Sequence, residues 1–269
     1  MVNSVIQKLL EIPQFEQRSP EWFAQRENKL TSSDAANVLG TNPYSTYNEL
    51  LFKKCGISTP FVGNIATLHG QKYEDEAIEK YCRITGKKNY NFGMISYDDV
   101  HLNSNNYNEK YTFLAGSPDG IVESIYNEEE EPILLEVKCP FKRKIIDGYV
   151  PTYYIPQVQL NLFICNLNIA DFIEYCPRTN KLNIVRIKKN LNWLNNNLPK
   201  FESFWNEVLY YRENDIQTNP AMIEKKLKDK IKKEKKEQKE QKEQKEQNLE
   251  NSDEESSIIS NNCIIIDDN

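Results

Sequence analysis

The chain has 269 residues, 39% of them hydrophobic, which is enough for a sizeable core and predicts one or two domains. Its formal net charge of −6 weighs against non-specific attraction to polyanions, although a confined basic groove remains compatible with it. No apolar run approaches the roughly 18–20 residues of a membrane-spanning helix. The N-terminal residues do not resemble a secretory signal, so a soluble intracellular protein is expected.

The few histidines and the scattered cysteines restrict the kinds of metal site that the chain can form. His69 and His101 cannot form a zinc site by themselves, and none of the six cysteines belongs to a C-x-x-C pair. Without a secretory signal, the cysteines are predicted to be free thiols in a reducing compartment. A catalytic metal is therefore expected to be bound by oxygen atoms, which favours magnesium or manganese.

Composition divides the chain into two parts. Residues 1–215 are mixed and rich in aromatic and turn residues, which predicts a folded domain. Residues 216–269 form a charged, low-complexity C-terminal tail, and residues 236–247 read KEQ four times. A three-residue repeat without apolar positions has no face to bury, so a solvated helix and a disordered segment are both compatible with it.

Capping residues and glycines predict four helices in the first part of the domain. In chain order, the helices are expected after Ser19, from Thr31 or Ser32 to Gly40, from Thr46 to Gly56, and from about Ile65 to Thr85. Segments with strand character follow at residues 88–95, 111–115, 119–124 and 133–138, then at 170–176 and 182–188. Two more helices are expected over residues 152–165 and 191–211. Helices that flank a small mixed sheet define an α/β fold.

The most informative pattern is an acidic residue after a turn, followed by a strand that carries an acid and a lysine. Gly116-Ser117-Pro118 is typical of a turn and leaves Asp119 at the start of a strand. Glu136 and Lys138 are two residues apart in the next strand, so their side chains point to the same face. Val137 faces the opposite side. A hairpin between the strands would bring Asp119 beside Glu136.

This combination has the chemistry of metal-assisted hydrolysis. Two neighbouring carboxylates repel each other unless a cation neutralises them, and magnesium favours carboxylate oxygens. The bound ion would polarise a phosphate and activate water, while Lys138 would orient that water or stabilise the developing charge. The alternative is a structural ion pair, because Glu-x-Lys is common in strands and acids are common after turns.

Five motifs in order resemble the lambda-exonuclease-like, YqaJ viral recombinase branch of the PD-(D/E)xK nucleases. They cover about residues 18–210 and read RSPEWFAQRENKLTSSDAANVLG, HGQKYEDEAIEKY, SPDG with LEVKCP, YYIPQVQLNLFI, and YCPR. The resemblance implies a restriction-endonuclease-like core. Two features depart from the family pattern: the acidic run YNEEEEP between the two catalytic strands, and Pro156, which fits a helix only near its first turn.

The resemblance also assigns roles to individual residues. It implies that Asp119, Glu136 and the backbone carbonyl of Val137 bind the metal, and that Lys138 is the catalytic lysine. Glu74 would be a further acid near the metal, although Glu74, Asp75 and Glu76 also fit an ordinary solvated helix face. Gln157 would lie near the lysine or the attacking water, with Tyr154 in support on the same helix.

Arg26 and Ser33 match the family positions that hold a DNA phosphate. A guanidinium binds phosphate with two donors, and a helix N-terminus offers free N–H groups. The alternative is that Arg26 pairs with Glu21 or Glu27 while Ser33 only caps a helix.

The implied activity is a magnesium-dependent DNA exonuclease that degrades duplex ends, with 5′-to-3′ resection for recombination or repair. The implied partners are double-stranded DNA ends and a single-strand-annealing protein, and family members form trimers. A nicking or structure-specific endonuclease would use the same metal site. A protein that binds nucleic acid without cleaving it is a third possibility.

Overall fold

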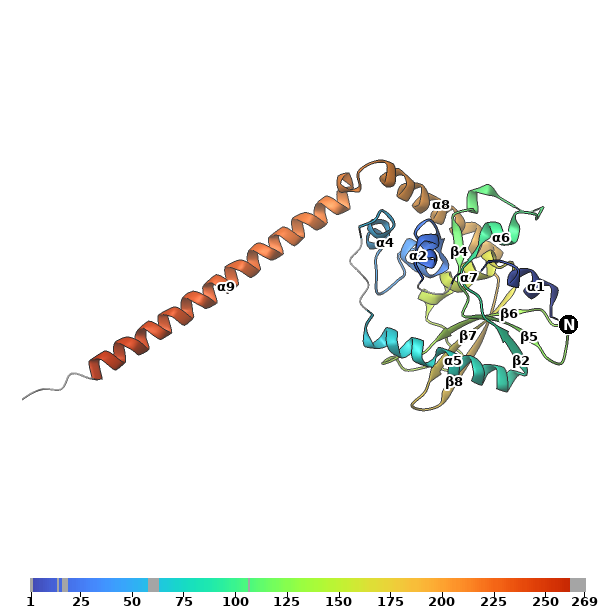
Figure 1. Ribbon diagram of the computed structural model, residues 1–269, viewed down its shortest axis with the longest axis horizontal. Coiled ribbons are helices and arrows are strands. Elements are labelled where there is room, and N and C mark those ends of the chain that lie inside the picture. The colour runs from blue at the N-terminus through green and yellow to red at the C-terminus, as the bar shows by residue number, and fades with distance from the viewer. Residues whose placement is uncertain (1, 14, 16–18, 58–62, 106, 262–269) are drawn as a thin grey trace, which may run out of the picture. The chain divides into compact units, whose positions relative to one another are not determined.

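The structure is a computed structural model, and it describes residues 2–13, 15, 19–57, 63–105 and 107–261 (Figure 1). The chain divides into two units, Met1–Asn214 and Asp215–Asn269. The first unit contains both β-sheets and most of the helices. Its α-helices are α1 Ser4–Leu10, α2 Pro20–Glu27, α3 Ala35–Val38, α4 Tyr47–Lys54, α5 Ile65–Thr85, α6 Tyr97–His101, α7 Ile155–Ile164 and α8 Leu191–Glu213.

The larger sheet has five strands in the order β2-β5-β6-β7-β8. Strands β6 and β7 pair in parallel and the other neighbours pair antiparallel, so the sheet is mixed. A smaller sheet has three strands in the order β1-β4-β3. The strands are β1 Leu30–Thr31, β2 Lys87–Tyr90, β3 Ile95–Ser96, β4 Leu114–Gly116, β5 Gly120–Ser124, β6 Ile133–Lys138, β7 Ile169–Cys176 and β8 Lys181–Lys188.

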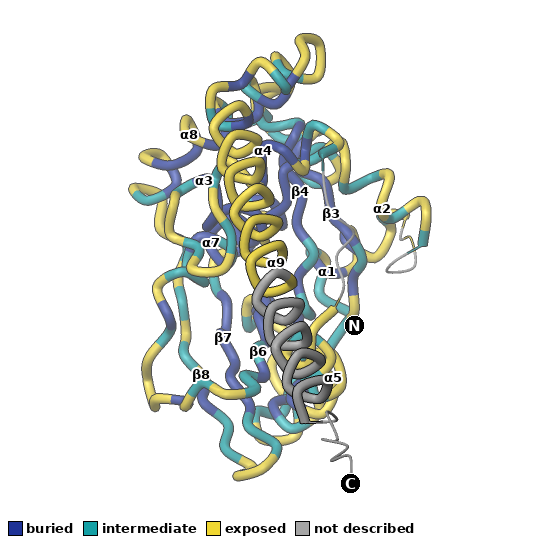
Figure 2. The backbone as a smooth tube through the Cα atoms, turned by 90° about the vertical axis from the view of Figure 1, so that its left-hand side faces the viewer, coloured by how far each residue is buried: buried dark blue, intermediate teal, exposed yellow. Residues whose placement is uncertain are grey.

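Helices cover both faces of the larger sheet. Alternate residues of β6 and β7, including Val137 and Ile173, pack with Tyr81 of α5 in one hydrophobic cluster. The other alternate residues, including Glu136 and Phe172, face α7 and the 3-10 turn before it. Figure 2 shows β6 and β7 largely in the colour of buried backbone. The expected α/β class, with a small mixed sheet flanked by helices, is confirmed.

The predicted helix over Ile65 to Thr85 is confirmed as α5 with those bounds. Asn64 caps its first turn by accepting a hydrogen bond from the Thr67 N–H, and Gly86 ends it with a φ of 64°, a conformation that favours glycine. The capping box of Thr46 and Glu49 is also present at the start of α4. These local signals were sufficient because each acts within one helical turn.

The predicted single strand over residues 88–95 is wrong. The segment is divided between β2, which pairs with β5, and β3, which pairs with β4 in the smaller sheet. The chain passes from one sheet to the other at residues 91–94, where Asn91 and Gly93 are weak strand formers. Two short helices, α1 and α6, were not predicted.

The second unit begins with the 3-10 turn η4 Ile216–Thr218 and continues as helix α9 Pro220–Asn261. Its residues 223–244 are exposed. Successive lysines and glutamates four residues apart form ion pairs along it, among them Lys236–Glu240 at 3.6 Å and Lys239–Glu243 at 3.5 Å. The KEQ repeat thus places opposite charges at the i,i+4 spacing that stabilises a helix without a buried face. Within the described part of the chain, no helix is long and apolar enough to cross a membrane.

Candidate active site

The β5–β6 hairpin holds Asp119 against the backbone of the neighbouring strand. The Asp119 N–H donates to the carbonyl of Leu135 at 3.2 Å, just before Gly120 pairs with Leu135 in the sheet. The Asp119 carboxylate accepts a hydrogen bond from the Val137 N–H at 2.6 Å. The side chain is therefore fixed next to the segment that carries Glu136 and Lys138, as the hairpin geometry predicts.

Three oxygen atoms surround the ammonium group of Lys138. Its Nζ lies 2.5 Å from Oε1 of Glu136, 3.0 Å from the backbone oxygen of Val137 and 3.8 Å from Oδ2 of Asp119. These are the three groups that the family resemblance implies as metal ligands. In the structure they converge on one cation, the lysine itself.

Burial makes this arrangement electrostatically demanding. Glu136 is fully buried, and burial raises the pKa of its carboxyl to about 7, with smaller contributions in the same direction from Asp119 and Glu74 and opposition from Lys138. Burial alone would lower the pKa of Lys138, but Glu136 and Asp119 outweigh it and raise that pKa above its usual value. The ammonium group therefore remains charged, while the acids have more negative charge than one lysine compensates.

The donor atoms of this site fit a hard divalent cation. All three are oxygens, which magnesium and manganese favour. Oε1 of Glu136 is buried, and beyond its ion pair with Lys138 it has no hydrogen-bond partner among the described residues. Asp119, Glu136 and the Val137 carbonyl are therefore the groups that would hold the ion.

Glu74 reaches the same region from α5. It lines a pocket of about 330 Å³ together with Asp119, Pro118 and Phe92. Its charge acts on Glu136, raising the pKa of that carboxyl, and among the described residues no three side chains of Asp, Glu, His or Cys converge on one ion position. The structure thus brings Glu74 into the same pocket lining as Asp119.

Tyr154 and Gln157 approach from the other side. Tyr154 lies in the 3-10 turn η3 Thr152–Tyr154, which directly precedes α7, and its ring centroid is 5.5 Å from Nζ of Lys138. Pro156 occupies the first turn of α7, where a proline is tolerated. Gln157 is half-buried on the same turn, and no hydrogen bond joins its amide to Lys138 among the described contacts.

Asn161 is a contact of the site that the sequence did not suggest. It is fully buried one turn after Gln157, and its amide donates to Oε2 of Glu136 at 3.3 Å. A Cβ atom at position 116 would lie 2.3 Å from Oδ1 of the Asn161 side chain, so Gly116 leaves room for this residue. The available signal was a polar residue inside the apolar run VQLNLFI, at helical spacing from Gln157.

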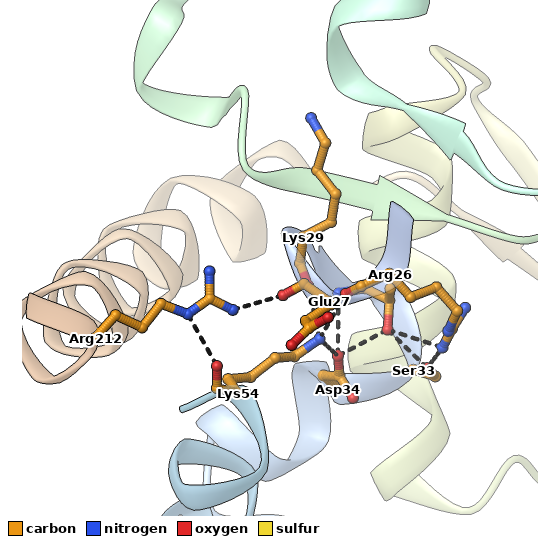
Figure 3. A network of polar contacts seen from close by, with 8 residues as sticks. Arg26, Glu27, Lys29, Ser33, Asp34, Lys54 and Arg212 are labelled. Carbon is orange, nitrogen blue, oxygen red and sulfur yellow. Dashed lines mark hydrogen bonds and ion pairs between the residues drawn. The ribbon is translucent and has the colours of Figure 1, made fainter. Parts of the chain in front are cut away.

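Arg26 and Ser33 lie together at a second location (Figure 3). The Arg26 guanidinium donates to the hydroxyl oxygens of Thr31 and Ser33, both at 3.3 Å, rather than pairing with Glu21 or Glu27. It also lies 4.4 Å from the ring centroid of Trp22. Ser33 is exposed. The structure therefore presents a guanidinium and a hydroxyl group side by side at the surface.

The buried ion pair of Lys54 and Asp34 stabilises the segment that carries Arg26. Lys54 of α4 lies 3.0 Å from Asp34 and donates to the backbone oxygens of Lys29 at 2.6 Å and Arg26 at 3.2 Å. Asp34 in turn accepts from the hydroxyl group of Thr31 at 2.8 Å. Lys54 thus connects the end of α2 to the turn that carries Thr31 and Ser33 (Figure 3).

Arg212 of α8 holds the same region from a distant part of the chain. Its guanidinium donates to the backbone oxygens of Glu27 at 2.7 Å and Lys54 at 2.9 Å. Free carbonyls at the ends of α2 and α4 are thereby satisfied.

The acidic run YNEEEEP lies at the far end of the hairpin from the site. It forms the turn between β5 and β6, whereas Asp119 and Lys138 flank the opposite ends of those strands. Glu130 in this turn pairs with Lys87 of β2 at 2.5 Å. A strand of five residues spans roughly 17 Å, which separates the acidic turn from the lysine.

The family of the chain is identified by sequence comparison. The model of the YqaJ-like viral recombinase domain matches residues 21–168. The chain therefore belongs to this family.

Two viral proteins are similar to the chain. One is the uncharacterized protein R354 of Acanthamoeba polyphaga mimivirus, 32% identical over 182 residues, which cover 64% of this chain and 31% of R354. The other is protein D345L of African swine fever virus (strain Badajoz 1971 Vero-adapted), 30% identical over 169 residues, covering 55% of this chain and 46% of D345L. The chain thus matches less than half the length of either relative.

Among solved structures, the chain is similar to the alkaline exonuclease LHK-Exo of Laribacter hongkongensis. The TM-score is 0.56 at 22% identity, over 72% of this chain and 95% of the exonuclease. A complex of the same exonuclease with dAMP matches with a TM-score of 0.56 over 76% of this chain and 100% of the other. At this identity the similarity establishes a shared fold.

Proposed function

We propose that the chain is a magnesium-dependent DNA exonuclease that hydrolyses phosphodiester bonds at duplex ends. The observation that carries this proposal is the convergence of Asp119, Glu136 and the Val137 carbonyl on the ammonium group of Lys138. Membership of the YqaJ-like family and the fold shared with an alkaline exonuclease support the same reaction class. Residues 1–215 would form the nuclease domain, and residues 216–269 an added tail.

The residues divide the chemistry among them. Magnesium, with manganese as a substitute, supplies Lewis acidity when bound and lowers the pKa of the attacking water. Asp119, Glu136 and the Val137 carbonyl would hold the ion, and Glu74 would add negative charge beside it. Lys138 stays protonated beside the carboxylates, so it is suited to stabilising charge that develops on the phosphate. Gln157 would orient the water, and Tyr154, whose ring lies beside the lysine, would support it.

Arg26 and Ser33 are the proposed contacts for a terminal phosphate. A half-buried guanidinium beside an exposed hydroxyl group suits a phosphate monoester, which offers several acceptor oxygens. Recognition of a 5′-phosphate would give 5′-to-3′ polarity, and the resected end would pass to a single-strand-annealing partner. Assembly as a homo-oligomer, a trimer by family resemblance, belongs to the same proposal.

The test is cleavage of an end-labelled, 5′-phosphorylated linear duplex and of a closed circular duplex, each with magnesium or with EDTA. Magnesium-dependent shortening of the linear duplex alone, lost in Asp119→Ala and Lys138→Ala, is expected. Cleavage of the circle would change the assignment to an endonuclease. Retained DNA binding without cleavage of either substrate would contradict a catalytic role.

Glu74 needs a matched control because it lies on a solvated helix. Glu74→Gln is expected to raise the magnesium concentration for half-maximal cleavage, since it removes negative charge from the pocket shared with Asp119. Glu79→Gln changes an exposed acid on the same helix and is expected to leave that concentration unchanged. Equal behaviour of the two variants would exclude Glu74 from the site.

A further inference from the structure

An exposed tyrosine is held rigidly in the loop between α3 and α4. Tyr44 is 77% exposed. The buried residue Asn37 holds the loop on both sides of Tyr44, because its amide oxygen accepts from Asn42 at 2.7 Å and its amide nitrogen donates to the Thr46 carbonyl at 3.3 Å. The Tyr44 N–H also donates to the Asn42 side chain at 2.9 Å. A large, solvent-exposed aromatic ring is therefore carried by a loop that several hydrogen bonds hold in place.

Tyr44 is the outer member of a row of aromatic rings that ends at Lys138. The ring centroids of Tyr44 and Tyr153 are 6.0 Å apart, and those of Tyr153 and Tyr154 are 4.4 Å apart. Tyr154 lies 5.5 Å from the Lys138 ammonium and packs on Phe172 of β7. The row thus leads from the solvent to the candidate catalytic lysine.

A positively charged side chain accompanies the row. Arg143 forms an ion pair with Glu174, which is fully buried in β7. Asn183, also buried, donates to Glu174 at 3.3 Å and accepts from the Gly148 N–H at 2.9 Å, which ties down the loop that carries Arg143. The charge of Arg143 acts on Tyr44, lowering its pKa against the larger upward effect of hydrogen bonding to Tyr153. Arg143 is therefore anchored beside the tyrosines.

We propose that Tyr44, Tyr153 and Arg143 form a binding strip for unpaired nucleotides of a DNA strand next to the active site. Aromatic rings stack on bases of any sequence, and a guanidinium binds the backbone phosphates between them. Bases inside a duplex are already stacked on their neighbours, so the strip selects a strand that has been separated from its complement. This inference rests on the proposed nuclease function, because it assigns the strip to that enzyme's substrate.

Binding measured in EDTA tests the strip independently of cleavage. The probes are a fluorescent oligothymidylate of about 20 nucleotides and a blunt duplex of the same length, each titrated with the full chain and followed by fluorescence anisotropy. Tyr44→Ala is expected to weaken oligothymidylate binding about fivefold or more, the effect of losing one base stack. Tyr44→Phe keeps the ring and is expected to bind within about twofold of the unmodified chain.

A second exposed tyrosine supplies the matched control. Tyr126 is 84% exposed in the β5–β6 turn, and Tyr126→Ala is expected to leave oligothymidylate binding unchanged. The blunt duplex should change less than about twofold in every variant. Unchanged binding by Tyr44→Ala, equal weakening by Tyr44→Phe, equal weakening for the duplex, or no oligothymidylate binding by the unmodified chain would each overturn the strip. Failure of magnesium-dependent cleavage with this binding pattern intact would instead overturn the nuclease assignment.

Discussion

Two carboxylate–lysine pairs among the described residues, Asp34–Lys54 and Glu136–Lys138, differ in the direction in which the pKa of the carboxylate is shifted. Burial raises the pKa of Asp34, but Lys54 at 3.0 Å and the Thr31 hydroxyl outweigh it, and the pKa falls below its usual value. Burial also raises the pKa of Glu136, and there Lys138 does not compensate.

The difference arises from the neighbours of each pair. Asp34 accepts hydrogen bonds from both the N–H and the hydroxyl of Thr31, so its negative charge is satisfied locally. Glu136 has the like charges of Asp119 and Glu74 nearby. A buried carboxylate whose neighbours carry more negative charge than its lysine compensates is suited to bind a further cation, whereas a satisfied one has a structural role. The pair of Asp34 and Lys54 therefore stabilises the fold, whereas the pair of Glu136 and Lys138 is suited to chemistry.

The same substitution at the two lysines is the strongest test of this contrast. Lys54→Met would leave Asp34 buried with its charge unpaired, and a loss of about 3–5 kcal/mol in the free energy of unfolding is expected. Lys138→Met should cost much less stability, because Glu136 can take up a proton and become neutral. Urea denaturation at neutral pH measures both values. Adding Asp34→Asn to Lys54→Met should recover part of the loss, and equal losses at the two lysines would contradict the comparison.

Activity is expected to show the reverse order. Lys138→Met should lower the rate of duplex cleavage by about 100- to 1000-fold, the usual effect of losing one group that stabilises developing charge. Single-turnover assays at saturating magnesium measure this rate. The folded fraction of Lys54→Met, isolated at low temperature, should retain chemistry and show its defect in KM for 5′-phosphorylated ends, since Lys54 supports Arg26.

Stability in EDTA should depend on pH in opposite directions at the two acids. The folded-state pKa of Glu136 is raised to about 7, above an unfolded value of about 4.3, so its contribution to stability is lost as pH rises through about 7. The Tm of the unmodified chain should therefore fall relative to Glu136→Gln between pH 5 and pH 8, and magnesium should reverse the fall.

Asp34 provides the control for this measurement. Its pKa is lowered, so its contribution is complete above the unfolded value of about 3.9 and is lost only as pH falls through its folded value. Asp34→Asn should therefore lower Tm by the same amount throughout pH 5–8. A Tm difference between Glu136→Gln and the unmodified chain that did not vary with pH would contradict the raised pKa.

Two buried polar residues of α7 sharpen the comparison with a smaller effect. Asn161→Leu removes the hydrogen bond to Glu136, and a decrease of about tenfold in kcat is expected with little change in KM. Gln159 bonds the Lys188 carbonyl and the Asn190 N–H instead, so Gln159→Leu should lower stability and leave kcat unchanged. Steady-state kinetics and thermal melting of both variants separate the roles. A larger decrease in kcat for Gln159→Leu than for Asn161→Leu would contradict the assignment of Asn161 to the site.

Much of the local structure was predictable from the sequence because its causes lie close together along the chain. Asn64 and Gly86 set the ends of α5, and the strand alternation placed Glu136 and Lys138 on one face with Val137 on the other. The turn before Asp119 and the hairpin that follows also placed the Asp119 carboxylate beside Val137.

The remaining features depended on contacts between distant segments. The sequence of residues 88–95 predicts one strand, yet its first part pairs with β5 in the larger sheet and its end pairs with β4 in the smaller sheet. Asn161 reaches Glu136 only because α7 covers one face of β6. Lys54 reaches the Arg26 carbonyl, and Arg212 the Glu27 carbonyl, only after α2, α4 and α8 have packed together.

By itself, then, the sequence determined the ends of α5 and the alternation that groups Glu136 with Lys138, because these follow from interactions within a few residues. Tertiary structure alone decided that the charge of Asp34 is satisfied, while Glu136 lies among more negative charge than Lys138 compensates. That outcome is set by burial and by the charges of Asp119, Glu74 and Lys54, which depend on how whole helices and strands pack.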